Sequence, residues 1–168
     1  MYATHILLSL IATVSAIDVY GYRSNEKCSG NDYIVCRNVN PEVCCTRASG
    51  DVFKSIGFRA IPTNWNIYVT QSNGAENICC GGSNYSGGNY GFVTKKRSDG
   101  TCAAAGGCAS VARGDLTVFE NGPEFDMTGL DDALYTELVS TPVIHVSIWE
   151  NGGSADEIPS KFDAYKLE

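Results

Sequence analysis

Few residues of this chain have the types and spacing that catalysis requires. It contains two histidines, and His145 is the only one outside the first few residues. The Gly-x-Ser-x-Gly turn of many serine hydrolases is absent, and so is the His-Glu-x-x-His pattern of zinc peptidases. Val143 to Trp149 reads as a strand, so we interpret His145 as a structural residue. The sequence offers no complete catalytic set, and we expect binding rather than catalysis.

Paired carboxylates are the one catalytic arrangement that stays open. A glycosidase needs two acids about 5–10 Å apart. Glu120 and Glu150 fit best, because each follows an aromatic residue at a predicted strand end and precedes Asn-Gly. Acids in such positions are commonly solvated turn residues. A small carbohydrate-active hydrolase that uses Glu120 and Glu150 is therefore the alternative hypothesis.

The cysteines dominate the first two thirds of the chain. Neither metal-knuckle nor thioredoxin Cys-x-x-Cys spacing occurs, so we predict disulfides. Two pairs of cysteines are adjacent in the sequence, Cys44-Cys45 and Cys79-Cys80. Adjacent Cα atoms lie about 3.8 Å apart, closer than a disulfide normally requires, so the two cysteines of each pair should bond to different partners. The spacing does not choose among the possible pairings. The eight predicted disulfide cysteines are Cys28, Cys36, Cys44, Cys45, Cys79, Cys80, Cys102 and Cys108.

The N-terminus has the pattern of an export signal. Residues 6–12 are apolar, and Val14-Ser15-Ala16 offers small residues to a peptidase. We predict a signal peptide over 1–16 and a secreted, extracellular protein. The rest, 17–168, is predicted to be a single compact cysteine-rich β domain. The alternative is a disulfide-rich half, 17–110, and an acidic half without cysteines, 111–168.

Charge limits the partners. Residues 17–110 hold nine Lys/Arg and seven Asp/Glu, whereas 111–168 hold three Lys/Arg and twelve Asp/Glu. The net charges are therefore +2 and −9, and the acidic half disfavours nucleic acid. No apolar run approaches the about 20 residues of a membrane span. We expect an extracellular protein or a cell-wall polysaccharide as the target.

Short alternating segments predict an all-β fold. Ser55 to Ile61, Trp65 to Thr70 and Leu116 to Phe119 place apolar residues on one face, and Gly- and Asn-rich turns separate them. One helix is predicted from Leu130 to Val139, and Pro159 to Leu167 fits a short helix or a strand. We predict a disulfide-stabilised Greek-key sandwich or barrel with at most one or two short helices.

Leu116-Thr117-Val118-Phe119-Glu120, with Phe125 and Gly129 beyond, resembles the start of a βγ-crystallin Greek-key motif. Asp131-Asp132-Ala133-Leu134-Tyr135-Thr136 is similar to the calcium signature of that family, although Glu137 stands where a second Ser/Thr is expected. The resemblance implies a calcium-stabilised structural protein, with Asp131 and Asp132 as metal ligands. Helix capping by the same aspartates is the competing interpretation. Calcium is the only cofactor that we consider.

A second likeness concerns location. The segment from Cys36 to Cys45 resembles small secreted cysteine-rich proteins of fungi, which implies an effector, a toxin or a wall-associated protein. Asn84-Tyr85-Ser86 is a glycosylation sequon, with Asn84 as acceptor. The surrounding Gly/Ser-rich loop carries Tyr85 and Tyr90, which are candidate carbohydrate-binding residues.

Overall fold

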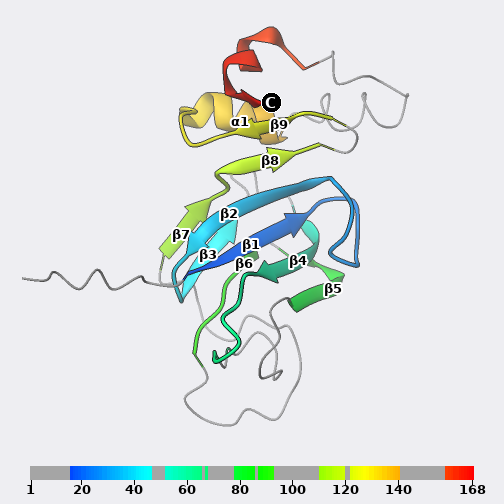
Figure 1. Cartoon of the computed structure of the whole chain (residues 1–168). Coiled ribbons are helices and arrows are strands. Elements are labelled where there is room, and N and C mark those ends of the chain that lie inside the picture. Colours follow the sequence, from blue (N-terminus) through cyan, green and yellow to red (C-terminus); the bar gives the residue numbers. More distant parts are fainter. Residues whose placement is uncertain are drawn as a thin grey trace, which may run out of the picture.

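The structure is a computed structural model, and it describes residues 16–46, 52–65, 67, 78–85, 87–92, 110–119, 122–140 and 158–168. Its strands form two sheets (Figure 1). The larger sheet has the strand order β10-β9-β8-β2-β1-β4-β5, and the smaller has the order β6-β3-β7. The larger comprises β1 (Ile17–Tyr22), β2 (Tyr33–Val39), β4 (Phe53–Arg59), β5 (Ile78–Tyr85), β8 (Leu116–Val118), β9 (Glu124–Asp126) and β10 (Lys166–Leu167). The smaller comprises β3 (Val43–Thr46), β6 (Gly87–Gly88) and β7 (Ser110–Arg113).

Alternation along β1 gives the larger sheet two different faces. Ile17 and Val19 are fully buried, whereas Asp18 and Tyr20 are only half-buried. Successive side chains of a strand point to opposite sides, so these two pairs mark opposite faces of the sheet. We call the side of Ile17 and Val19 the inner face and the side of Asp18 and Tyr20 the outer face.

The smaller sheet packs on the inner face. A Cβ on Gly88 would lie 2.5 Å from Ile56 Cγ2 and 3.2 Å from Val19 Cγ1, so only glycine allows this approach. The disulfide between Cys36 of β2 and Cys45 of β3 joins the two layers, with a Cα–Cα distance of 5.8 Å. The two sheets thus enclose one apolar core.

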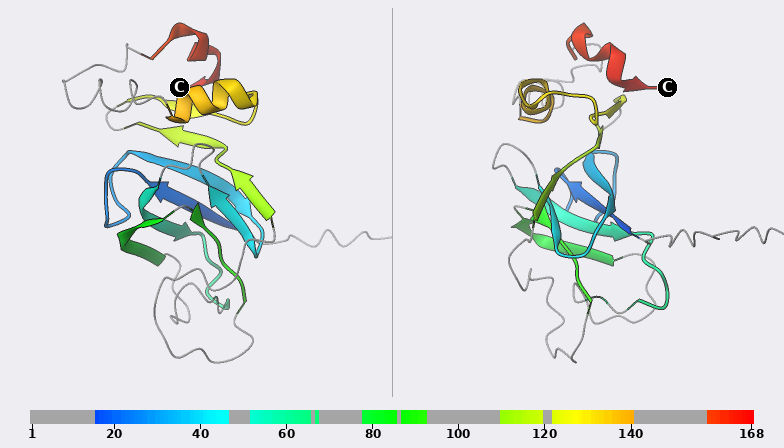
Figure 2. Two further views of the ribbon diagram at one scale, coloured as in Figure 1. Left: turned by 180° about the vertical axis from the view of Figure 1, so that it is seen from behind. Right: turned by 90° about the vertical axis from the view of Figure 1, so that its left-hand side faces the viewer.

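The C-terminal elements extend the same sheet and cover its inner face. β8 pairs with β2, and β9 pairs with β8. Helix α1 (Asp132–Ser140) and the 3-10 helix η3 (Ser160–Tyr165) lie at the β9 end of the sheet (Figure 2). Tyr135 and Phe162 are fully buried in the common core, where the Tyr135 hydroxyl accepts a hydrogen bond from the Gly114 N–H at 2.9 Å. Both halves of the chain therefore contribute to one sheet and one core.

Disulfides tie the layers and loops together. Cys28 bonds to Cys79, with a Cα–Cα distance of 5.7 Å. Cys44 and Cys80 are also disulfide-bonded, and none of the cysteines in the described part of the chain is free. The disulfide prediction is confirmed for these six cysteines, whereas Cys102 and Cys108 lie outside the described residues.

The predicted fold class is confirmed: the protein is all-β and disulfide-stabilised, and its described residues include two short helices. The strands predicted around Ile56 and Thr117 correspond to β4 and β8, and the predicted helix corresponds to α1. The predicted segment from Pro159 to Leu167 contains both a short helix and a strand, because η3 runs directly into β10. Both sheets are open, and in the described residues they form two layers and no closed barrel.

Candidate binding face

One row of side chains crosses the outer face from β1 to β10. Tyr22 lies opposite Tyr33, and Tyr33 lies opposite Val118. Val118 lies opposite Glu124, and Glu124 lies opposite Leu167. Directly paired residues point to the same side of a sheet, and with strands about 4.8 Å apart the row is about 19 Å long. Exposure rises along it, from the buried Tyr22 to the exposed Glu124 and Leu167.

Three tyrosine rings pack together at the β1–β2 end of this row. The Tyr33 ring centroid lies 5.3 Å from that of Tyr20 and 5.6 Å from that of Tyr22. These distances are those of favourable aromatic pairs. Tyr22 is buried, whereas Tyr20 and Tyr33 are half-buried and offer apolar ring surface to solvent. We call the exposed part of this region the tyrosine strip: Tyr20, Tyr33, Val118, Glu124 and Leu167.

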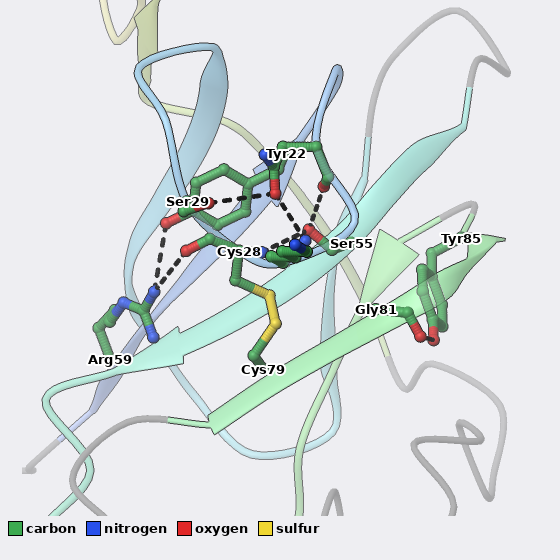
Figure 3. Close-up of a disulfide and its surroundings, with 10 residues drawn as sticks. Tyr22, Cys28, Ser29, Ser55, Arg59, Cys79, Gly81 and Tyr85 are labelled. Atoms are coloured by element: carbon green, nitrogen blue, oxygen red, sulfur yellow. Dashed lines mark hydrogen bonds between the residues drawn. A yellow bond between two sulfur atoms is a disulfide. The ribbon is translucent and has the colours of Figure 1, made fainter.

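The segment between β1 and β2, residues 23–32, covers the opposite end of the outer face, over β4 and β5 (Figure 3). A Cβ on Gly81 would lie 1.7 Å from the Glu26 carbonyl oxygen, so only glycine permits this contact. The Cys28 N–H donates to Ser55 Oγ at 3.1 Å, and the Ser55 hydroxyl donates to the Asn25 carbonyl oxygen at 2.6 Å. The segment is therefore fixed in place and forms one border of the strip.

Arg59 connects this segment to the tyrosine rings. Its guanidinium donates to the Cys28 carbonyl oxygen at 3.0 Å and to the Tyr22 hydroxyl at 3.3 Å. It also lies 5.9 Å from the centre of the Tyr20 ring, at cation–π distance. Gly57 leaves room for this arrangement, because a Cβ there would approach the Tyr22 ring to 3.1 Å.

The tyrosine hydroxyls of the strip are hydrogen-bond donors at neutral pH. Burial raises the pKa of Tyr20, and the nearby Asp18 carboxylate and Tyr22 hydroxyl raise it further. Burial likewise raises the pKa of Tyr33, with Tyr20 and the Glu124 carboxylate adding to the effect. Tyrosine ordinarily ionises near pH 10, so both hydroxyls carry their protons and can donate hydrogen bonds.

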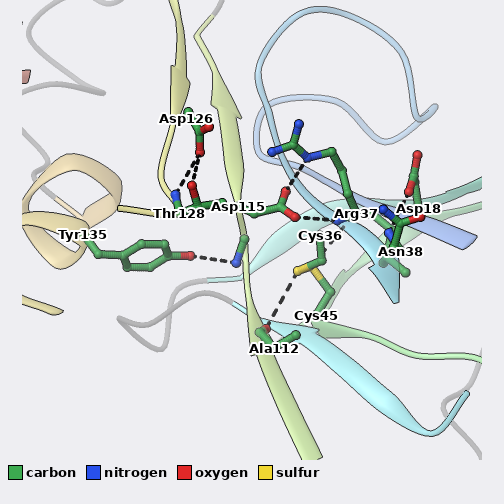
Figure 4. Close-up of polar contacts among 12 residues, drawn as sticks. Asp18, Cys36, Arg37, Asn38, Cys45, Ala112, Asp115, Asp126, Thr128 and Tyr135 are labelled. Carbon is green, nitrogen blue, oxygen red and sulfur yellow. Dashed lines mark hydrogen bonds and ion pairs between the residues drawn. A yellow bond between two sulfur atoms is a disulfide. The ribbon is translucent and has the colours of Figure 1, made fainter. Parts of the chain in front are cut away.

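Two further carboxylates, Asp115 and Asp126, lie in the β2–β8–β9 region with hydrogen-bond partners (Figure 4). Asp115 accepts hydrogen bonds from the backbone N–H and the Nε–H of Arg37, both at 3.1 Å. Hydrogen bonds from the Thr128 hydroxyl and N–H lower the pKa of Asp126. These carboxylates already have protein partners. Within the described residues, the Glu124 carboxylate has no ion-pair or hydrogen-bond partner.

A buried ion pair fastens the 23–32 segment to β8. The Arg23 and Asp32 side chains are only 5% and 8% exposed, with Nη2 and Oδ1 2.5 Å apart. The same Nη2 donates to the Val118 carbonyl oxygen at 2.7 Å, and the guanidinium lies 4.8 Å from the centre of the Phe119 ring. This pair has no access to solvent, so its role is to position the border of the strip.

The predicted carbohydrate-binding tyrosines have structural contacts. Tyr90 is fully buried, and its hydroxyl donates to the Val39 carbonyl oxygen at 2.8 Å. Its ring stacks on Trp65 and belongs to the core, so it is not offered to a surface ligand. Tyr85 is half-buried against the core at the end of β5. Asn84 also lies in β5, and its side chain is outside the described residues.

The two aspartates predicted as calcium ligands begin α1. Asp131 Oδ1 accepts a hydrogen bond from the Leu134 N–H at 2.8 Å, which is the geometry of a helix cap. Asp132 is exposed and pairs with Arg113, Nη1 to Oδ1 at 2.6 Å. Asp131 thus has the capping role that competed with calcium, and Asp132 has an ion-pair partner. In the part of the chain that the structure describes, no three His, Cys, Asp or Glu side chains gather closely enough to hold a metal ion.

The predicted acid pair cannot be placed, because Glu120 and Glu150 both lie outside the described residues. His145 and the predicted signal segment up to Ser15 lie outside them as well. Among the helices that are described, none has the length and apolar character needed to cross a membrane.

Comparison with known proteins places the chain in a family. A family model described as the ARB_05566_N N-terminal domain matches residues 18–115, which is more than half of the chain. The protein belongs to the ARB_05566_N family. A search of curated proteins and a search of solved structures each found no match. The ARB_05566_N match runs from the second residue of β1 to the residue before β8, so it includes Tyr20 and Tyr33 but neither Glu124 nor Leu167.

Our reading of the sequence missed Tyr20, Tyr33 and Glu124. Tyr20 stands in a strand whose alternation is visible in the sequence: Ile17, Val19 and Gly21 alternate with Asp18, Tyr20 and Tyr22. That pattern indicates one apolar and one aromatic face. The pairing of Tyr33 with Val118 and of Val118 with Glu124 could not be found in this way, because it joins strands far apart in sequence.

Proposed function

We propose that the protein is a secreted, non-enzymatic binding protein that recognises a cell-wall or other extracellular polysaccharide through the tyrosine strip. The observation that carries the proposal is the pair of half-buried rings, Tyr20 and Tyr33, held in contact on the outer face of the sheet. An effector-like or wall-associated role fits such a protein. We also propose that Asn84 carries a glycan and that the protein comes from a fungus. The resemblance to βγ-crystallin-like proteins is likewise kept as a proposal.

The physical basis is that sugar rings combine apolar C–H faces with hydroxyl edges. An aromatic ring can cover the C–H face, while its hydroxyl bonds to the edge. Tyr20 and Tyr33 supply both functions, because burial keeps their hydroxyls protonated. Their neighbours hold them in place before a ligand arrives, which lowers the entropic cost of binding. A row about 19 Å long has room for several sugar units.

Export is supported by the chemistry of the core. The six described cysteines are all in disulfides, and disulfides persist mainly in oxidising compartments. The first strand begins at Ile17, immediately after the predicted cleavage position. A mature chain that started there would retain every strand of both sheets.

The test incubates the purified secreted protein with insoluble chitin, glucan and cellulose and measures depletion from solution. We expect one of these polymers to deplete the protein. Replacing Tyr33 with Ala removes an exposed ring whose stacking contributes about 0.5–1.5 kcal/mol, so binding should weaken up to about tenfold. The matched control is Tyr85→Ala, which removes a half-buried tyrosine from β5, away from the strip.

The same incubation separates binding from hydrolysis. Depletion without released sugar supports the proposal. Released sugar that disappears in Glu120→Gln and in Glu150→Gln would instead establish the hydrolase hypothesis. Equal depletion by the wild type, Tyr33→Ala and Tyr85→Ala would show that binding does not use the strip, and absence of depletion would direct the search to a protein target.

A further inference from the structure

We infer that the tyrosine strip prefers a saccharide with a positive charge, the class represented by polymers of glucosamine with free amino groups. The inference rests on the proposed function and names the ligand class of the same site. Its basis is the carboxylate of Glu124, which has no partner among the described residues and stands in one row with the half-buried ring of Tyr33.

The geometry places the carboxylate within the length of a short oligosaccharide that stacks on Tyr33. Tyr33 and Glu124 are separated in the row by Val118, so they stand two strand spacings apart, about 10 Å. Glu124 is exposed and close enough to raise the pKa of both Tyr33 and Tyr20 through its charge. A ligand that stacks on Tyr33 and follows the row over Val118 therefore reaches Glu124.

The cations of the outer face do not neutralise this carboxylate. Arg37 is engaged by Asp115 on the neighbouring strand. The Arg59 guanidinium is directed toward Tyr22 and Cys28, on the opposite side of the rings. Of the five residues that define the strip, Glu124 has the one carboxylate and none has a cationic side chain, although Arg59 lies beside the Tyr20 ring. The acidic half of the chain, with a net charge of −9, strengthens the same negative potential.

The aromatic and the acidic parts favour the same ligand. An ammonium group gains from the face of a tyrosine ring by cation–π attraction and from a carboxylate by ion pairing. A neutral glucose unit gains only from stacking and hydrogen bonds. An N-acetylated unit has no charge for Glu124, and a uronic acid would be repelled by it.

The test compares glucosamine, N-acetylglucosamine and glucose oligomers of equal length and linkage by isothermal titration calorimetry. An exposed ion pair contributes about 0.2–1 kcal/mol, so we expect the glucosamine oligomer to bind up to about five times more tightly than the others. The preference should fall with added salt, because salt screens exposed charges. In Glu124→Gln the three affinities should converge.

A control of equal charge change is Asp163→Asn on η3, an exposed acid outside the strip. We expect it to keep the glucosamine preference. If Asp163→Asn reduces the preference as much as Glu124→Gln, the effect is one of net charge and the inference is wrong. If all three oligomers bind equally and only Tyr33→Ala weakens them, the inference fails while the proposed function stands. If Tyr33→Ala changes none of the affinities, the proposed function fails.

Discussion

The two faces of the larger sheet are built from the same strands but serve different purposes. The inner face is covered by the smaller sheet and by α1, and its side chains, such as Val19 and Phe58, are almost fully buried. Among the described residues, the 23–32 segment covers the β4–β5 end of the outer face, and the rest of that face carries tyrosines and charges. Where Gly88 of the smaller sheet meets the inner face there is no room for a larger residue, because an added Cβ would collide with Ile56.

If the proposed function is right, the difference separates stability from recognition. Apolar residues on the inner face gain free energy by leaving water, and their packing defines the fold. Tyrosines on the outer face gain part of that free energy while keeping ring surface available. A binding surface of this kind can change its ligand preference by exposed substitutions such as Glu124→Gln without weakening the core.

The largest contrast is expected between Phe58 and Tyr33. Phe58→Ala removes a ring that is only 2% exposed, and such core truncations cost about 3–5 kcal/mol in the free energy of unfolding. Tyr33→Ala removes a half-exposed ring with two aromatic neighbours, and we expect a cost of about 1–2 kcal/mol. Denaturant unfolding of both variants measures the difference. Equal losses would mean that the outer face is part of the core.

A second contrast concerns the two arginine–aspartate pairs. Arg23→Met leaves the buried Asp32 without its partner and should cost about 3–5 kcal/mol in the free energy of unfolding. The Arg37 and Asp115 side chains are 42% and 25% exposed, so Arg37→Met should cost about 1 kcal/mol or less.

Thermal and denaturant unfolding test both variants, and a double variant serves as the control. Arg23→Met combined with Asp32→Leu removes the unpaired charge and should be more stable than Arg23→Met alone. A double variant as unstable as the single one would show that the loss comes from packing against Phe119 rather than from the stranded carboxylate.

The two assigned disulfides should differ in reactivity. Cys79 is exposed, whereas Cys36 and Cys45 are 2% and 1% exposed. Thiol exchange requires access to a sulfur, so a mild reductant should open Cys28–Cys79 before Cys36–Cys45. Alkylation followed by peptide mass spectrometry identifies the order. Loss of either bond should cost about 2–4 kcal/mol, and loss of Cys28–Cys79 should also release the 23–32 segment.

The smallest effects are expected at the start of α1. Asp131→Ala removes a helix cap and should cost about 1 kcal/mol in the free energy of unfolding. Asp132→Ala removes only an exposed ion pair and should cost less. Thermal midpoints measured with calcium and with a chelator complete the experiment. A midpoint that rises with calcium in the wild type but not in Asp131→Ala would support a calcium site beyond the cap.

Local patterns were sufficient for much of the fold. The alternation around Ile56 and Thr117 predicted β4 and β8, and the leucine spacing after Leu130 predicted α1, because each depends on residues close together in the chain. The same reasoning placed Tyr90 in an exposed loop. Burial under Trp65 and the hydrogen bond to Val39 decide its position, and neither contact is visible locally.

The amino-acid sequence alone determined that the protein is all-β and that the six described cysteines form disulfides, because residue spacing and composition carry those properties. Only the tertiary structure decided which cysteines pair and which residues form a face. Cys28 and Cys79 are 51 positions apart, and the tyrosine strip joins β1 and β2 to β8, β9 and β10. The physical reason is that strand pairing brings together residues from distant segments, and register, not sequence distance, determines which side chains become neighbours.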